Sequence, residues 1–88
     1  MALFFLSYDL RNKRDYQSLY KVLENFQAIR VLESCWCFRR EGTTSKMLRD
    51  YFKQFVDGDD CLIVIQCNEI NNIPQWAGLN LLGNPNQL

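Results

Sequence analysis

The feature that most constrains this chain is the order in which two kinds of apolar pattern follow each other along its 88 residues. Two segments carry apolar side chains at helical spacing, and short apolar runs of strand length lie before, between and after them. The order is strand, helix, strand, strand, helix, strand. Two right-handed βαβ crossovers joined in this way place both helices on one face of a single antiparallel sheet.

The strand-type runs differ in how clearly they are bounded. Residues 2–8 are almost continuously apolar, which is typical of a strand covered on both faces. Residues 28–40 fit either one long bent strand or two short strands, and we favour two, the second running from Cys35 to Arg39. Residues 61–67 form the last clear strand.

Each predicted helix has an apolar stripe and a start signal. The first is expected from about Asp15 to Phe26, with the Asp15 carboxylate favouring the helix N-terminus. The second is expected to begin with a hydroxyl cap from Thr43 or Thr44 and to end near Gly58 in a left-handed cap. The stripes consist of Tyr16, Leu19, Tyr20, Leu23 and Phe26, and of Met47, Leu48, Tyr51, Phe52 and Phe55.

These elements predict an α+β domain with a ferredoxin-like βαββαβ fold over residues 1–67, a four-stranded antiparallel sheet with two helices on one face. Residues 68–88 form a polar, turn-rich C-terminal segment that is expected to dock on or swap with a partner protomer, and residues 84–88 are expected to fray. Because the helices cover one face only, a second copy of the chain is the simplest cover for the other. We therefore expect a homodimer.

Charge and composition exclude several classes of function. Ten Lys and Arg balance ten Asp and Glu, which argues against a strong non-specific nucleic-acid binder. The chain has no histidine, so Ser-His-Asp and Cys-His catalysis are excluded. No secretory signal and no apolar run of membrane-spanning length are present, so we expect a cytoplasmic protein with no membrane partner. Its cysteines are expected to be buried strand residues: Cys35, Cys37, Cys61 and Cys67.

Without histidine, acid–base chemistry must come from carboxylates, Tyr, Lys or Cys, and Asp9 is the most suggestive carboxylate. It stands at the end of the first strand, where two copies facing each other across a dimer axis could bind Mg²⁺ or Mn²⁺ and activate a water molecule. The alternative is that Asp9 only closes its loop. Arg11 and Arg14 follow, and Arg39 lies at the end of the third strand, so these side chains form either a basic rim for phosphates or ordinary solvated surface.

Two further clusters have a structural and a functional interpretation. Asp57, Asp59 and Asp60 resemble a fragment of a calcium loop, but the rest of that loop is missing, and we expect a turn that caps the helix. Tyr8, Trp36 and Phe38 are aromatic strand residues that could stack on bases, although strand aromatics are more often core or interface.

The sequence Ser7-Tyr8-Asp9-Leu10 resembles the strand-loop motif of the small CRISPR-associated Cas-two family and its VapD-type relatives. Residues 30–36 are similar to that family's segment around a serine followed by an aromatic, and Asp60 before the last strand also fits. The resemblance covers roughly residues 3–67 and is closest to the uncharacterised "SinR-like" branch.

This resemblance implies a ferredoxin-like homodimer, and several members of the family are metal-dependent nucleases on RNA or DNA. The family's metal-binding aspartate falls on Asp9 and its phosphate-proximal serine on Ser34, while Arg11 and Arg30 would contact the nucleic-acid backbone. We expect an endonuclease dependent on Mg²⁺ or Mn²⁺. The alternatives are a non-catalytic dimeric scaffold or toxin-type interaction module, and a small-ligand regulatory domain.

Overall fold

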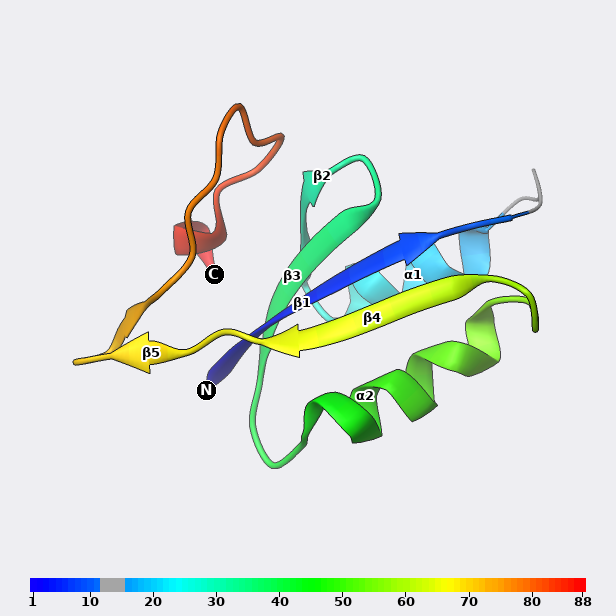
Figure 1. The fold of residues 1–88 in the computed structure, drawn as a ribbon, viewed down its shortest axis with the longest axis horizontal. Coiled ribbons are helices and arrows are strands. Elements are labelled where there is room, and N and C mark those ends of the chain that lie inside the picture. Colours follow the sequence, from blue (N-terminus) through cyan, green and yellow to red (C-terminus); the bar gives the residue numbers. More distant parts are fainter. Residues whose placement is uncertain (12–15) are drawn as a thin grey trace.

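The computed structural model describes residues 1–11 and 16–88. Its main strands are β1 (Ala2–Asp9), β2 (Ile29–Leu32), β3 (Cys35–Arg40) and β4 (Cys61–Gln66), and its helices are α1 (Gln17–Asn25) and α2 (Ser45–Phe52). The strands form one antiparallel sheet in the spatial order β2-β3-β1-β4 (Figure 1). The prediction of an α+β domain with a four-stranded antiparallel sheet and two helices is confirmed, as is the division of residues 28–40 into two strands.

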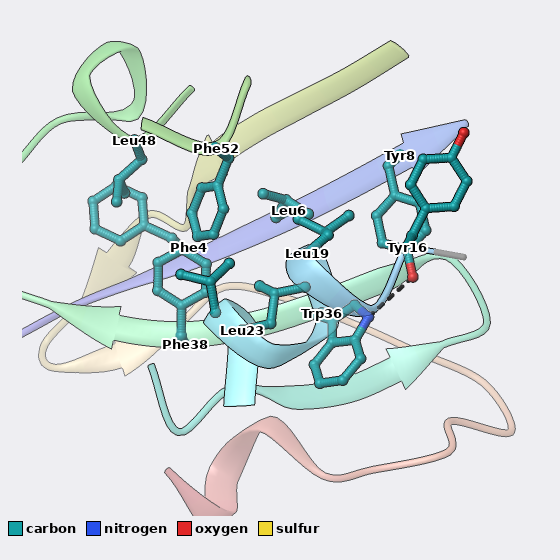
Figure 2. Packing of buried hydrophobic residues seen from close by; sticks show 11 residues of the cluster. Phe4, Leu6, Tyr8, Tyr16, Leu19, Leu23, Trp36, Phe38, Leu48 and Phe52 are labelled. Carbon is teal, nitrogen blue, oxygen red and sulfur yellow. Dashed lines mark hydrogen bonds between the residues drawn. The ribbon is translucent and has the colours of Figure 1, made fainter. Parts of the chain in front are cut away.

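One face of the sheet packs against both helices. Phe4, Leu6 and Tyr8 alternate along β1, and Trp36 and Phe38 lie opposite Leu6 and Phe4 on β3. Leu19 and Leu23 of α1 and Leu48 and Phe52 of α2 complete this cluster (Figure 2). The alternation of strand residues and the helical stripes therefore meet in one core, as the apolar patterns predict.

The opposite face, called here the second face, carries Leu3, Cys37 and Val31 as its own buried cluster. Trp76, Leu81 and Leu88 of the C-terminal segment pack against that cluster. The expectation that a second copy of the chain covers this face is therefore corrected in part: over β2, β3 and the start of β1, the chain covers it with its own residues. The reason is chain length, since residues 68–88 are long enough to turn back across the sheet.

The C-terminal segment begins with a short hairpin, β5 (Glu69–Ile70) and β6 (Ile73–Pro74). It then returns beside β2, where the Leu82 amide donates a hydrogen bond of 2.9 Å to the Val31 carbonyl (Figure 1). The prediction that residues 84–88 fray is wrong: they form a 3₁₀ turn, Pro85–Gln87, with Pro85 buried and the Asn84 side chain accepting from the Asn86 amide.

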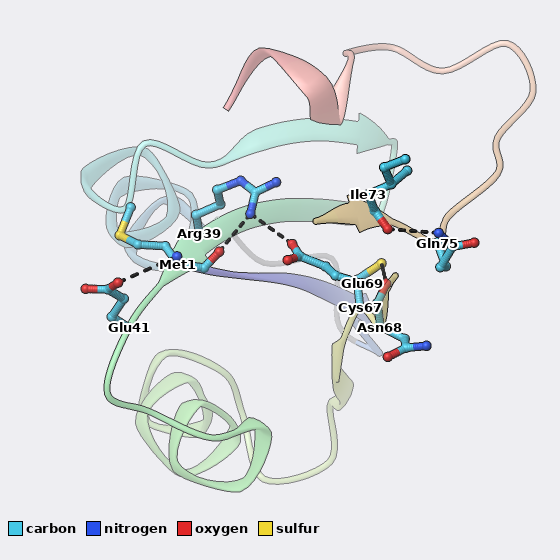
Figure 3. A network of polar contacts seen from close by, with 8 residues as sticks. All are labelled: Met1, Arg39, Glu41, Cys67, Asn68, Glu69, Ile73 and Gln75. Atoms are coloured by element: carbon cyan, nitrogen blue, oxygen red, sulfur yellow. Dashed lines mark hydrogen bonds and ion pairs between the residues drawn. The ribbon is translucent and has the colours of Figure 1, made fainter. Parts of the chain in front are cut away.

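Arg39 fastens the start of this segment to the sheet. Its guanidinium donates to the Met1 carbonyl at 2.7 Å and pairs with the Glu69 carboxylate at 3.1 Å (Figure 3). The Met1 amino group in turn lies 3.6 Å from a Glu41 carboxylate oxygen. Arg39 therefore links β3, the chain's first residue and the hairpin.

The helix boundaries refine the sequence expectations. Thr44, rather than Thr43, caps α2, because its hydroxyl accepts a hydrogen bond of 3.2 Å from the Met47 amide. The helix ends at Phe52 and continues as a 3₁₀ turn, Lys53–Phe55. The predicted left-handed cap at Gly58 is wrong, since the φ of Gly58 is not positive. The start expected at Asp15 lies outside the described residues.

Candidate functional site

Asp9 is the last residue of the central strand β1, and its side chain is 74% exposed. It is paired across the sheet with Cys61, the first residue of β4, so both side chains leave the sheet on the second face. A shallow hollow of about 180 Å³ is formed there by Ser7, Tyr8, Asp9, Cys61, Leu62 and Ile63. The predicted metal ligand is thus accessible to solvent and to a large substrate.

Arg11 supplies a positive charge beside Asp9. Its Nε lies 3.8 Å from the Asp9 carboxylate, and its Nη2 donates to the Cys61 sulfur at 3.6 Å. The hydrogen bond to Cys61 and the negative charge of Asp9 raise the pKa of the Arg11 guanidinium above its ordinary value. Arg11 therefore places a positive charge beside two residues that line the hollow, Asp9 and Cys61.

Asp60 positions the chain at Arg11. One oxygen of its carboxylate accepts from the Arg11 amide at 2.8 Å and from the Tyr16 hydroxyl at 3.2 Å, and the other accepts from the Asp57 amide at 2.8 Å. Through these hydrogen bonds, Asp60 connects the segment after β1, the start of α1 and the turn before β4. Its role in the structure is that of a turn residue with long-range partners.

Ser34 lies in the turn between β2 and β3, next to the same end of β1. Its carbonyl accepts a hydrogen bond of 3.0 Å from the Tyr8 amide, which continues the pairing of Ser7 with Cys35. Because Tyr8 immediately precedes Asp9, the Ser34 backbone is bonded to β1 one residue before the strand-end aspartate. The structure therefore brings together Asp9, Arg11 and the Ser34 turn.

The other predicted nucleic-acid contacts do not join this group. Arg39 pairs with Leu3, six residues before Asp9 along β1, which is roughly 20 Å at the rise of an antiparallel strand. Arg30 pairs with Trp36, whose side chain faces the helices, so Arg30 extends from the other face of the sheet. Arg14 lies outside the described residues.

Sequence reasoning placed all four cysteines in the interior, and Cys61 corrects it. Cys37 is fully buried, and burial followed by the neighbouring Cys35 raises the pKa of its thiol to about 11. Cys61, in contrast, is exposed and receives the hydrogen bond from Arg11. The sequence places both cysteines in strands. They differ because the C-terminal segment covers the second face over Cys37 and leaves it open at Cys61.

Within residues 1–11 and 16–88, no three His, Cys, Asp or Glu side chains lie close enough to hold a metal ion together. A single copy of the chain offers Asp9 as one exposed carboxylate. A divalent cation bound there would take its remaining ligands from water, from a phosphate or from a second copy of the chain.

Fold and site together define a small α+β domain with an exposed strand-end carboxylate beside an arginine. In the part of the chain that the structure describes, no helix combines the length and apolar character needed to cross a membrane. No protein family matches the chain, and no solved structure matches it.

Proposed function

We propose that this chain has a ferredoxin-like fold and acts as a Cas-two-like homodimeric endonuclease that cleaves phosphodiester bonds of RNA or DNA with Mg²⁺ or Mn²⁺. The observation that carries the proposal is the placement of Asp9, exposed at the end of a central strand with Arg11 and the Ser34 turn beside it. The element order β1-α1-β2-β3-α2-β4 and the sheet order β2-β3-β1-β4 support the fold assignment.

The carboxylate of Asp9 suits a hard divalent cation. Mg²⁺ in proteins commonly keeps several water ligands and is held by one or two carboxylates together with substrate phosphates. Asp9 would provide such a ligand on an open surface. When bound, the metal lowers the pKa of its water and stabilises the charge that develops on the phosphate.

A second copy of the chain would dock on the part of the second face that the C-terminal segment leaves open. Ile63 and Ile65 of β4 are exposed there, at 54% and 52%, and they pair with Ser7 and Phe5 of β1. Exposed apolar side chains in one row favour a self-complementary contact. Because Asp9 ends the same row of β1, a twofold contact over these strands would bring two Asp9 carboxylates toward each other.

The remaining residues of the site would handle the nucleic acid. Arg11 would steady a phosphate with its charged guanidinium, and Ser34 would orient the group that is cleaved. Arg39 would contact nucleic acid only as a separate site, because it lies near the other end of β1 and is paired with Glu69.

The test is cleavage of labelled single- and double-stranded RNA and DNA with and without Mg²⁺ or Mn²⁺. Asp9→Asn removes the charged ligand and should lower metal-dependent cleavage on the order of 100-fold or more. Asp50→Asn is the matched control, because Asp50 is an exposed carboxylate on α2 paired with Arg49 at 2.8 Å. Equal cutting by the wild type and Asp9→Asn would refute the proposal.

One contact favours a second function, a non-catalytic dimeric scaffold. Arg11 already lies 3.8 Å from the Asp9 carboxylate, and an arginine there competes with a metal cation. On this alternative, Asp9 and Arg11 fix the end of β1, and a protein or an uncleaved nucleic acid is the ligand. Titration with Mn²⁺ separates the two functions: paramagnetic broadening of the Asp9 and Leu10 amide signals supports the endonuclease, and an intact dimer without broadening supports the scaffold.

A further inference from the structure

Arg30 is the centre of a cluster that the proposed site does not use directly. It lies on the edge strand β2 opposite Trp36 and extends from the face of the sheet that packs against the helices. Asp9 leaves the sheet on the second face, beside Cys61. A phosphate held at Asp9 would therefore lie across the sheet from the Arg30 guanidinium.

Two of the five N–H donors of the Arg30 guanidinium bind within the chain. Its Nε and Nη2 both donate to the Glu33 carbonyl, at 2.9 and 2.6 Å. The Tyr8 hydroxyl donates to the same carbonyl at 3.4 Å. Three donors so converge on one backbone oxygen in the turn between β2 and β3.

Aromatic rings fix the guanidinium in this position. Its central carbon lies 5.3 Å from the centre of the Tyr20 ring and 5.4 Å from that of Trp36, within the range of cation–π attraction. The Trp36 indole donates to the Tyr8 hydroxyl at 3.1 Å, and both side chains are only 7% exposed (Figure 2). Arg30 is thereby tied to β1, β3 and α1 at once.

The turn that Arg30 holds is the one that carries Ser34. Glu33, whose carbonyl is fixed by Arg30, precedes Ser34, whose carbonyl is fixed by the Tyr8 amide at 3.0 Å. Tyr8 in turn precedes Asp9. Two consecutive carbonyls of the turn therefore both accept hydrogen bonds from Tyr8, the residue that precedes Asp9.

We propose that Arg30 is a positioning residue, which sets the Glu33–Ser34 turn relative to Asp9 and does not itself contact a nucleic-acid phosphate. The inference rests on the proposed function for its catalytic consequence, whereas its structural part concerns this chain alone. It also gives the Tyr8–Trp36 pair a role, as the buried link between the turn and the central strand.

Lysine at position 30 separates positioning from phosphate contact. A lysine keeps the positive charge and can hold a phosphate, but it has no planar fork for a carbonyl and no guanidinium face to stack on Tyr20 and Trp36. Arg30→Lys is therefore the test variant. Arg40→Lys is the matched control, because Arg40 also lies over an aromatic ring, that of Phe26 at 3.9 Å, but far from the turn.

The first readout needs no activity. In Arg30→Lys, the NMR signals of the Tyr8 amide, the Ser34 amide and the Trp36 indole N–H should shift. Hydrogen exchange of the Tyr8 amide should also accelerate by roughly 10-fold or more. Signals of α2 should stay in place in Arg30→Lys, and the Tyr8, Ser34 and Trp36 signals should stay in place in Arg40→Lys. Unchanged Tyr8 and Trp36 signals in Arg30→Lys would overturn the inference.

The second readout is kinetic. We expect kcat of Arg30→Lys to fall by about 10- to 100-fold while KM stays within about twofold, because the turn is misplaced and binding is retained. A raised KM with unchanged kcat and a shallower salt dependence of binding would instead identify a phosphate contact and contradict the proposal. Arg40→Lys should change neither parameter.

Two safeguards keep the result decisive. If Arg30→Lys does not fold, Trp36→Phe replaces one of the two rings beside the Arg30 guanidinium with a smaller ring and removes the indole donor to Tyr8. It should produce the same pattern of Tyr8 and Ser34 signals in weaker form, and unchanged signals would then overturn the inference. If the wild type cleaves nothing, the endonuclease proposal fails, and the NMR result still decides whether Arg30 holds the turn.

Discussion

Cys37 and Cys61 are both strand cysteines on the second face, yet their surroundings are opposite. Cys37 lies under the C-terminal segment in a cluster with Leu3 and Val31, and burial raises the pKa of its thiol to about 11. Cys61 lies at the uncovered end of β4 with Arg11 as its hydrogen-bond donor. The C-terminal segment therefore shields the Cys37 thiol from solvent and leaves the Cys61 thiol exposed.

The raised pKa of Cys37 predicts alkaline instability. The unfolded chain loses this proton near the ordinary value of 9.0, whereas the folded chain keeps it to about 11. Between these pH values the unfolded state binds fewer protons, so the free energy of unfolding falls as pH rises, by at most about 1.4 kcal/mol per pH unit. Urea unfolding across this range should show a flatter pH dependence for Cys37→Val than for the wild type. An equal slope in both would contradict the assignment.

At the scale of elements, α2 shows how a short helix is maintained. It has eight residues, which is too short to be stable alone in water, and it buries Leu48 and Phe52 against the sheet. Its first turn is fixed by the hydrogen bond from the Met47 amide to the Thr44 hydroxyl. Packing provides most of the stability, and the cap defines where the helix starts.

Thr44→Ala should therefore destabilise the domain by about 1 kcal/mol, because the Met47 amide loses its side-chain partner. The expected observation is a lower urea midpoint with an unchanged m-value. Thr43→Ala is the neighbouring control and should stay within about 0.5 kcal/mol of the wild type. A larger loss for Thr43→Ala than for Thr44→Ala would show that the cap is assigned to the wrong residue.

At the scale of the whole molecule, one half of the second face is covered by the C-terminal segment and the other half is open to solvent. The C-terminal segment covers the side of β2 and β3, while Ile63 and Ile65 of β4 remain exposed. The segment is held at its start by Arg39 and Glu69 and further on by the Leu82 amide on β2 (Figures 1 and 3). The covered half stabilises a single chain, and the open half is available for association.

Removing Trp76 should loosen the segment without unfolding the sheet. Trp76 packs on the cluster of Leu3, Val31 and Cys37, so Trp76→Ala should lower the free energy of local opening by roughly 1.5–3 kcal/mol. Hydrogen exchange of the Leu82 amide measures this opening and should accelerate. Leu79→Ala, in the same segment but 82% exposed, should leave the exchange rate unchanged. Equal rates in Trp76→Ala and the wild type would show that Trp76 does not anchor the segment.

If the chain dimerises through the open half of the second face, a charge placed there should separate the two copies. Ile63→Lys adds a charge to the proposed contact and should convert a dimer to a folded monomer, as measured by analytical ultracentrifugation and circular dichroism. Met47→Lys is the control, since Met47 is similarly exposed but lies on α2. A dimer that survives Ile63→Lys would move the interface elsewhere and separate the two Asp9 residues.

The sequence by itself determined the four main strands, the two helices and their order along the chain. Residues 2–8 and 61–67 are apolar runs of strand length, and the stripes of both helices recur at 3.6-residue spacing, so local periodicity was sufficient. It also placed Asp9 at a strand end, because a carboxylate directly after an apolar run has few other positions to take.

Only the tertiary structure decided which side chains meet. Strand register placed Cys61 opposite Asp9 and sent Arg30 to the other face, and a shift of one residue would have reversed both results. The return of the C-terminal segment over Cys37 and Val31 had no periodic signal either, since its contacts with the sheet are few and far apart in sequence. The sheet face on which a side chain lies, the residue opposite it and the segment that covers it all depend on pairing between residues far apart in the sequence. Local patterns carry no information about that pairing.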